Sequence, residues 1–254
     1  MLGPVLELAD VARARRDPGL VVLEGFHAVK HAVRFGGELL GVWTADADEL
    51  AQLSARLAPD LALSATVVGR DELAAVVPRA QVVAVARRPA QPDPDGILAL
   101  EGPAPVILLE DPRHLGNLGA AVRVAAAADA AALLTTGAAD PWDPAALRGA
   151  AGLQFALPVA RVAEPPGDRP LIALHPGGEE LTALPADATL AFGTERAGLS
   201  GALLARADGR VGIPMRPGVS SLNLATAVAV ALYSERSGFS QRSIVHTGRM
   251  PTDS

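Results

Sequence analysis

Three short segments of the chain combine glycine with polar side chains in spacings that suit a binding site. They are "DPRHLGNLGAAVR" (residues 111–123), "GTERAGLS" (residues 193–200) and "IPMRPGVSSLN" (residues 213–223). The first segment carries one arginine, Arg123, in a stretch with helical character that is otherwise mostly alanine and valine. A guanidinium group binds phosphates through paired hydrogen bonds. Arg123 is therefore a candidate for binding an anion.

Each segment follows an apolar run that predicts a β-strand: residues 106–110, 189–194 and 210–215. In open α/β sheets, ligands bind outside the carboxyl ends of the strands. We therefore expect the three segments to face one site. Their glycines fit neither the dinucleotide-binding nor the P-loop pattern, so both kinds of nucleotide site are excluded on sequence.

Taken one at a time, the polar residues have structural alternatives. Glu195 beside Arg196 fits a solvated loop acid as well as a functional one. Ser220 or Ser221 fits the N-cap of a final helix with Asn223 in its first turn. Only the three segments taken together indicate a function.

In this order, the segments resemble the three motifs of the SpoU (TrmH) family of the SPOUT methyltransferase superfamily: N-x-G-x-x-x-R, G-x-E-x-x-G, and I-P-M with S-L-N. The matching residues are Asn117, Gly119 and Arg123; Gly193, Glu195 and Gly198; and Ile213, Pro214, Ser221, Leu222 and Asn223. "ALRGAAGLQFALPV" (residues 146–159) is similar to a further family segment, R-x-S-x-G-x-x-F-x-x-P. Ala150 stands where that segment has serine, so no hydroxyl is available there.

The resemblance implies methyl transfer from S-adenosylmethionine (AdoMet) to a ribose 2'-hydroxyl of structured RNA, with ribosomal RNA favoured over transfer RNA. It also implies a deep trefoil knot in the C-terminal domain, a homodimer, and a reaction without a metal ion. By the same correspondence the cofactor contacts fall at Gly193, Ile213 and Leu222, with neighbouring Thr194, Gly198, Pro214 and Met215.

The resemblance also implies roles for the polar residues. Arg123 would bind the phosphate beside the reactive ribose and stabilise developing negative charge; whether it also accepts the proton is left open, and pairing with Glu195 is its structural alternative. Asn117 would orient the ribose or Arg123, and Glu195 would hold Arg123 or a group of the partner subunit. Ser221 and Asn223 would complete the polar wall of the site.

Several basic residues are weaker candidates. Proposed RNA contacts are Arg13, Arg15, Arg16, Lys30 and Arg148. For His27 and His31, as for Lys30, a polar helix face is the first interpretation and RNA contact the alternative. His114 beside the first motif is a general-base candidate that the family does not require. The net charge of −6 argues against general coating of nucleic acid but allows a local basic cleft.

The elements that position these residues alternate between strands and helices, which indicates an α/β protein. Residues 1–90 resemble a small ribosomal-protein-like α/β domain that binds RNA, and residues 102–240 resemble the SpoU domain. We expect residues 91–101 to form a linker and residues 241–254 a mobile tail. The predicted strands are residues 20–25, 39–45, 63–69, 81–88, 106–110, 131–136, 155–162, 170–175, 189–194 and 210–215. The predicted helices are residues 26–35, 47–57, 70–77, 117–128, 144–152 and 220–237. Uniformly apolar strands after the linker predict a parallel sheet covered on both faces.

Composition removes several classes of function. Without cysteine, the chain can form no disulfide, thiolate metal site or cysteine nucleophile. The N-terminal residues carry charges inside what would be the apolar region of a signal peptide, and no apolar run reaches about 18 residues. We expect a cytoplasmic protein. The alternatives to an RNA methyltransferase of general metabolism are an inactive RNA-binding or ribosome-assembly factor with the same fold, and a methyltransferase that confers antibiotic resistance.

Overall fold

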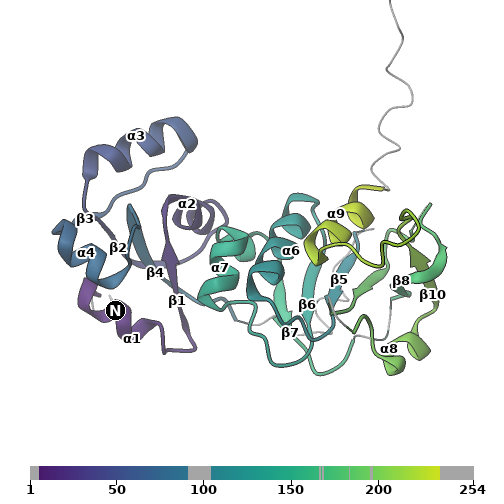
Figure 1. Ribbon diagram of the computed structural model, residues 1–254. Coiled ribbons are helices and arrows are strands. Elements are labelled where there is room, and N and C mark those ends of the chain that lie inside the picture. Colours follow the sequence, from purple (N-terminus) through teal and green to yellow (C-terminus); the bar gives the residue numbers. More distant parts are fainter. Residues whose placement is uncertain are drawn as a thin grey trace, which may run out of the picture.

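The computed structural model describes residues 6–90, 104–165, 167, 169–182, 184–194 and 197–234. These residues form two lobes, each built on its own sheet, which we call the N-terminal lobe (residues 6–90) and the C-terminal lobe (residues 104–234) (Figure 1). Among them, no helix combines the length and the apolar character needed to cross a membrane.

The N-terminal lobe holds a four-stranded mixed sheet in the order β1-β4-β2-β3. Its strands are β1 (Leu20–Glu24), β2 (Leu39–Thr44), β3 (Thr66–Val67) and β4 (Val82–Arg87). Strand β4 runs antiparallel to β1 and β2, whereas β2 and β3 are parallel. Its helices are α1 (Val11–Ala14), α2 (Phe26–Arg34), α3 (Ala47–Leu57) and α4 (Arg70–Val76), preceded by the 3₁₀ helix η1 (Leu8–Asp10).

Alternating side chains of β4 divide the apolar core of this lobe. Val82 and Ala84 face α2 and α3, whereas Val83 and Val85 face α1 and α4. This is the two-residue period of a strand buried on both sides. The short η1 and α1 were not predicted.

The C-terminal lobe holds a six-stranded sheet in the order β10-β8-β9-β5-β6-β7, in which every pair is parallel. The strands are β5 (Val106–Leu109), β6 (Ala132–Thr135), β7 (Val159–Arg161), β8 (Leu171–Glu180), β9 (Thr189–Phe192) and β10 (Gly209–Gly212). The helices are α6 (Leu115–Ala127), α7 (Pro144–Ala150), α8 (Gly201–Arg206) and α9 (Leu224–Ser234), with the 3₁₀ helix η2 (Leu153–Ala156). The parallel α/β sheet predicted from the sequence is thus confirmed.

Both faces of this sheet are covered, as the apolar strands predict. Ile107 and Leu109 of β5 pack against α6, α7 and α9 on one face. Val106 and Leu108 pack against α8 on the other face. Four details differ from prediction. Helix α8 was not predicted, and β8 continues to Glu180 rather than ending at residue 175. Residues 155–156 belong to η2 rather than to a strand, and the final helix begins at Leu224 rather than residue 220.

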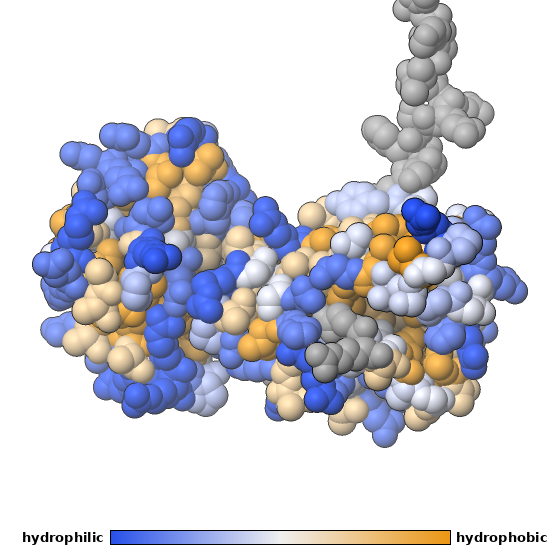
Figure 2. Space-filling model, viewed as in Figure 1, coloured by the Kyte–Doolittle hydropathy of each residue, from blue (hydrophilic) through white to orange (hydrophobic). Residues whose placement is uncertain are grey.

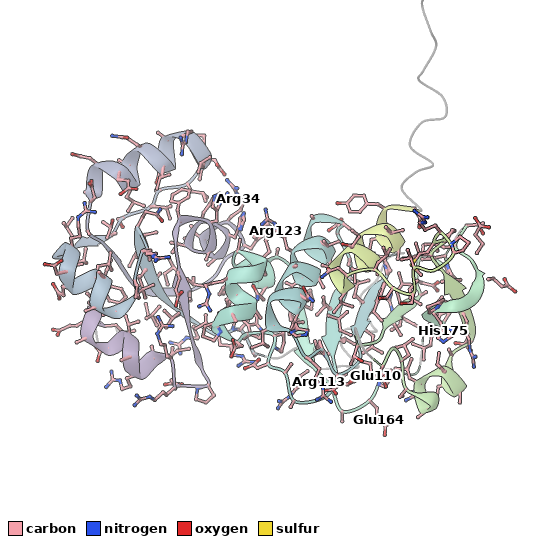
Figure 3. All side chains as sticks on the ribbon, viewed as in Figure 1. Arg34, Glu110, Arg113, Arg123, Glu164 and His175 are labelled. Carbon is pink, nitrogen blue, oxygen red and sulfur yellow. The ribbon has the colours of Figure 1, made fainter. Side chains whose placement is uncertain are left out.

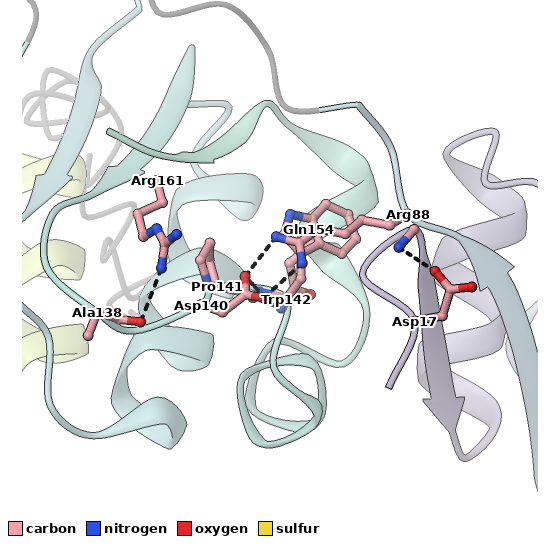
Figure 4. Close-up of polar contacts among 9 residues, drawn as sticks. Asp17, Arg88, Ala138, Asp140, Pro141, Trp142, Gln154 and Arg161 are labelled. Atoms are coloured by element: carbon pink, nitrogen blue, oxygen red, sulfur yellow. Dashed lines mark hydrogen bonds and ion pairs between the residues drawn. The ribbon is translucent and has the colours of Figure 1, made fainter. Parts of the chain in front are cut away.

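A tight seam joins the two lobes. Arg88, which follows β4, forms two hydrogen bonds of 2.8 Å with the Asp140 carboxylate and lies 5.9 Å from the ring centre of Trp142. Trp142 belongs to the same core cluster as α2 and packs edge-on against Phe155. Figure 4 shows this region, where the buried Gln154 amide donates a hydrogen bond to the Pro141 carbonyl oxygen. The seam therefore fixes how α2 lies relative to the C-terminal lobe.

Candidate active site

A cavity of about 380 Å³ lies beside the middle of β8 and the ends of β9 and β10, next to the start of α9. This volume suits a small organic ligand. Six of the seven residues predicted to contact a cofactor line it: Gly193, Thr194, Gly198, Ile213, Met215 and Leu222. Pro214 is not among the lining residues, although both of its neighbours are. The second and third motifs therefore meet at one cavity, as their positions after parallel strands predict.

The loop after β9 is folded so tightly that only glycine fits at its ends. The Thr194 and Gly198 backbones exchange two hydrogen bonds of 3.1 and 3.0 Å. A Cβ atom on Gly193 would overlap the backbone of Gly198 and Leu199, and Gly198 has a φ of +66°. The two glycines of G-x-E-x-x-G thus supply a close approach and a left-handed turn. Glu195, the acid of this motif, lies outside the described residues together with Arg196.

The loop before α9 supplies the polar end of the cavity. Asn223 Oδ1 accepts hydrogen bonds from the backbone N–H groups of Ala225 at 3.0 Å and Thr226 at 3.4 Å. Asn223 is therefore the N-cap of α9. The prediction that Ser220 or Ser221 caps a helix with Asn223 in its first turn was wrong. Both serines instead line the cavity.

Asn223 also connects the first motif to the third. Its Nδ2 donates a hydrogen bond of 3.1 Å to Oδ1 of Asn117 on α6. The two residues are 106 positions apart in the chain. Asn117 and Asn223 thus lie together, next to the lining residues Leu222 and Leu224.

Gly119, the glycine of the first motif, shows why α6 is rich in small residues: they allow another helix to approach closely. A Cβ atom on Gly119 would overlap the carbonyl oxygen of Ala146 and lie 2.9 Å from the backbone nitrogen of Ala150. Helices α6 and α7 therefore approach backbone to backbone. Ala150 is fully buried in this contact, so the alanine in place of the family's serine fills a packing position rather than a wall of the cavity.

Arg123 lies elsewhere on α6. Its side chain is exposed and is not part of the cavity lining in its own chain. Its positive charge contributes to lowering the pKa values of His27 and Lys30, so its guanidinium faces α2 of the N-terminal lobe. Within a single chain, Arg123 therefore lies away from the cavity, and its role there stays a prediction.

The remaining candidates are placed as follows. Arg15 and Arg148 both form ion pairs with Glu24, at 2.8 and 3.1 Å, and Arg13 pairs with Asp10 at 3.0 Å. Arg16 and His114 are exposed, and Lys30 is largely buried. Exposed ion pairs of this kind contribute little to stability, so contact of Arg13, Arg15 and Arg148 with RNA stays a prediction.

The sequence interpretation missed two residues at this edge of the sheet. His175 lines the cavity, and its Nδ1 accepts a hydrogen bond of 3.0 Å from the Gly177 backbone. Glu110, after β5, accepts hydrogen bonds from the Ser200 backbone and hydroxyl at 2.7 and 2.6 Å. Glu110 thereby ties the end of β5 to the N-terminus of α8. Both residues directly follow or end a predicted strand, which is the pattern that could have identified them.

Comparison with known proteins agrees with the geometry of the site. The SpoU rRNA Methylase family model matches residues 104–233. A tRNA/rRNA methyltransferase of Synechocystis is 32% identical over 252 residues, which cover 88% of this chain and 86% of the relative. A 23S rRNA uridine 2'-O-methyltransferase of Streptomyces viridochromogenes is 35% identical over 170 residues, which cover 60% of this chain and 58% of the relative.

A solved structure shows the same fold over nearly the whole described chain. It is the SpoU methyltransferase AviRb of Streptomyces viridochromogenes in complex with AdoMet, with a TM-score of 0.75 at 25% identity, covering 91% of this chain and 97% of that one. The family match over more than half of the chain and the similarity to the Synechocystis relative lead to one conclusion: the chain belongs to the SpoU rRNA methylase family.

Proposed function

We propose that the protein transfers a methyl group from AdoMet to a ribose 2'-hydroxyl of ribosomal RNA. The observation that carries this proposal is the single cavity lined by residues of the second and third family motifs, with Asn117 of the first hydrogen-bonded at its edge. The relatives named as 23S rRNA 2'-O-methyltransferases and the AdoMet-bound structural neighbour support ribosomal RNA and AdoMet for this chain.

The cavity fits the cofactor in size and in lining. At Gly193 the backbone of Gly198 and Leu199 packs directly against the chain, so backbone forms part of the lining, and Ile213, Met215 and Leu222 supply apolar walls. We assign cofactor contacts to these residues and to Thr194 and Gly198, with Pro214 shaping the turn between its two neighbours. AdoMet supplies a methyl group on a good leaving group, so the protein needs to position the ribose and stabilise the charge that develops on its oxygen.

We assign that second task to Arg123, which would bind the phosphate beside the reactive ribose. Arg123 does not line the cavity of its own chain, so we propose that it serves the cavity of the partner subunit in a homodimer. Helix α9 exposes Val230 and Tyr233, apolar surface that suits an interface between subunits. In the proposed dimer, Glu195 and Ser221 complete the polar wall with Asn117 and Asn223.

The finer features implied by family membership are also proposals. They are a trefoil knot in the C-terminal lobe, an N-terminal domain that binds RNA in the manner of a ribosomal protein, action in the cytoplasm, and a metal-free reaction.

Mapping of 2'-O-methyl groups in ribosomal RNA tests the proposed function. RNA from cells with and without the gene is compared nucleotide by nucleotide. We expect one position to lose its methyl group when the gene is absent and to regain it when the gene is restored. Identical maps in both strains would contradict a ribosomal RNA substrate.

A further inference from the structure

Two helices from different lobes bring positive side chains to the space between the lobes. Figure 2 shows the surface hollowed there, and Figure 3 shows Arg34 and Arg123 beside this hollow, which we call the inter-lobe notch. Helix α2 carries His27, Lys30 and Arg34 at spacings of three and four residues, which place them along one side of the helix. Helix α6 carries Arg123, which Figure 3 shows near Arg34 of α2. The notch is thus basic although the chain as a whole is acidic.

The seam between the lobes holds α2 in place. A Cβ atom on Gly152 would lie 2.9 Å from Cα of Ala28, so the backbone after α7 touches the backbone of α2 directly. His31 on α2 donates a hydrogen bond of 2.7 Å from Nδ1 to the carbonyl oxygen of Ala151. With the Arg88 and Asp140 pair, these contacts fix α2 against the C-terminal lobe. The distance between α2 and Arg123 is therefore a property of the fold.

The positive groups in the notch crowd one another. Lys30 is only 8% exposed, and its ammonium group donates a hydrogen bond of 3.3 Å to Nδ1 of His27. Burial is the main cause that lowers the pKa values of both residues, and the charge of Arg123 lowers them further. The carboxylate that acts on Lys30 is Asp60, which already accepts two hydrogen bonds from Arg34, at 2.6 and 2.7 Å.

Arg123 itself forms no hydrogen bond or ion pair with any residue that the structure describes. A guanidinium that no described carboxylate binds, near the buried ammonium group of Lys30, is electrostatically unfavourable. An anion placed between the two cations would relieve that cost. Since Nδ1 of His27 accepts from Lys30, the ring proton lies on Nε2, which can donate to an anion. The three side chains come from two lobes, and Arg123 is close enough for its charge to act on both His27 and Lys30.

We propose that His27 and Lys30 of α2, together with Arg123 of α6, form one binding site for a phosphodiester group of the RNA substrate. The site rests on the proposed function and specifies how the RNA is held. Arg123 supplies paired donors, Lys30 a compact positive charge and His27 a single donor, a combination suited to phosphate oxygens. The N-terminal lobe thereby contributes directly to the substrate site and brings the RNA strand to Arg123.

The Lys30→Met variant tests this site, because methionine keeps the buried apolar stem and removes the charge. Ribosomal RNA from cells that lack the gene is the probe, and binding is measured at several salt concentrations. We expect RNA affinity to fall about tenfold and the slope of log K against log salt to decrease by about one, as the loss of one phosphate contact predicts. In methyl transfer, KM for RNA rises by a similar factor while AdoMet affinity is unchanged, and Lys30→Arg restores most of the binding.

Arg70→Met is the matched control. Arg70 is exposed on α4, which Figure 1 shows on the far side of the N-terminal sheet from α6. We expect this variant to bind RNA like the parent, with the same salt dependence.

A second variant, His27→Ala, removes an exposed ring and tests the site without disturbing the core. We expect it to weaken RNA binding about threefold, less than Lys30→Met because one neutral donor is lost. If both variants bind RNA with the parental affinity and salt slope, the phosphate site is wrong, even if the parent transfers methyl groups normally. If the parent transfers no methyl group but the variants still lose RNA affinity, the phosphate site stands and the proposed function fails.

Discussion

The cavity and the inter-lobe notch are formed by different structural elements and different types of side chain. The cavity is formed by loops after parallel strands, and its described lining is glycine, small polar and apolar residues with His175 as its one imidazole. The notch is formed by two helices that present cationic side chains. We propose that the cavity recognises the cofactor through backbone groups and shape, and that the notch recognises RNA through charge.

This difference separates two tasks that the proposed reaction needs. A cavity lined by closely packed backbone does not tolerate added side chains. At Gly193, for example, the backbone of a neighbouring segment already occupies the place of a side chain. A charged notch instead tolerates changes of shape and is sensitive to loss of charge. Changes in the cavity should therefore affect the cofactor, and changes in the notch should affect RNA and the chemical step.

Gly193→Val should have the largest effect, because its side chain would overlap the backbone of Gly198 and Leu199. We expect AdoMet affinity to fall about a hundredfold or more, as overpacking of about 3 kcal/mol would cause, and methyl transfer to be lost. Isothermal titration with AdoMet measures the change. Gly201→Val is the matched control, since nothing lies within 4 Å of a Cβ atom at Gly201. If Gly193→Val bound AdoMet as tightly as the parent, the cofactor could not bind in this cavity.

Arg123→Ala should show that the cavity and the notch have different tasks. We expect methyl transfer to fall about a hundredfold or more through loss of charge stabilisation, with AdoMet affinity unchanged. Single-turnover transfer of labelled methyl groups measures the first, and titration with AdoMet the second. Transfer at the parental rate would refute the role of Arg123.

Mixed dimers show which cavity Arg123 serves. When Arg123→Ala and Gly193→Val chains are combined, each mixed dimer contains one intact cavity and one intact arginine, on different subunits. If Arg123 acts across the interface, random mixing should restore about a quarter of the parental activity. If it acts within its own chain, mixing restores none.

Asn223→Ala should have a moderate effect, because Asn223 both caps α9 and holds Asn117. We expect loss of the cap to destabilise the protein by about 1 kcal/mol and to lower Tm by roughly 2 to 4 °C. Asn223→Asp keeps an oxygen for the cap but cannot donate to Asn117. This second variant should therefore retain Tm and lose methyl transfer, whereas equal transfer by Asn223→Asp and the parent would make the contact with Asn117 merely structural.

The smallest expected effect is a pH dependence that arises at the seam. Burial is the main cause that lowers the pKa of His31 below its usual 6.5, although its hydrogen bond to Ala151 opposes the shift. The unfolded chain then binds a proton that the folded chain does not, so the stabilisation is present above about pH 6.5 and is lost as pH falls through the lowered pKa. Between about pH 7.5 and about pH 5.5, Tm of the parent should fall by about 2 °C more than Tm of His31→Gln. If the curves of Tm against pH are parallel for the parent and His31→Gln, groups other than His31 cause the loss of stability in acid.

The sequence predicted those parts of the fold that depend on local pattern. The apolar runs identified the strands of the parallel sheet, and the glycine motifs identified the residues around the cavity. Helix α8 and the segment of η1 and α1 were missed because they are too short to show a helical period. The start of α9 was misplaced because serine and asparagine are equally good N-caps, and only the path of the chain selects Asn223.

Features that depend on packing between distant segments could not be predicted. The Arg88 and Asp140 pair joins residues 52 positions apart. The approach of Lys30 to Arg123 depends on how the seam orients the lobes, which no local pattern encodes. For the same reason, nothing in the sequence shows that Arg123 lies outside the cavity of its own chain.

The most direct test of the central claim is to follow the label from methyl-labelled AdoMet into RNA. The purified protein is incubated with ribosomal RNA from cells that lack the gene, and the RNA is then digested to nucleosides. We predict that the label appears in a single 2'-O-methylated nucleoside and that Arg123→Ala abolishes it. Label in a base-methylated nucleoside, or AdoMet binding with no label in any RNA, would contradict the account.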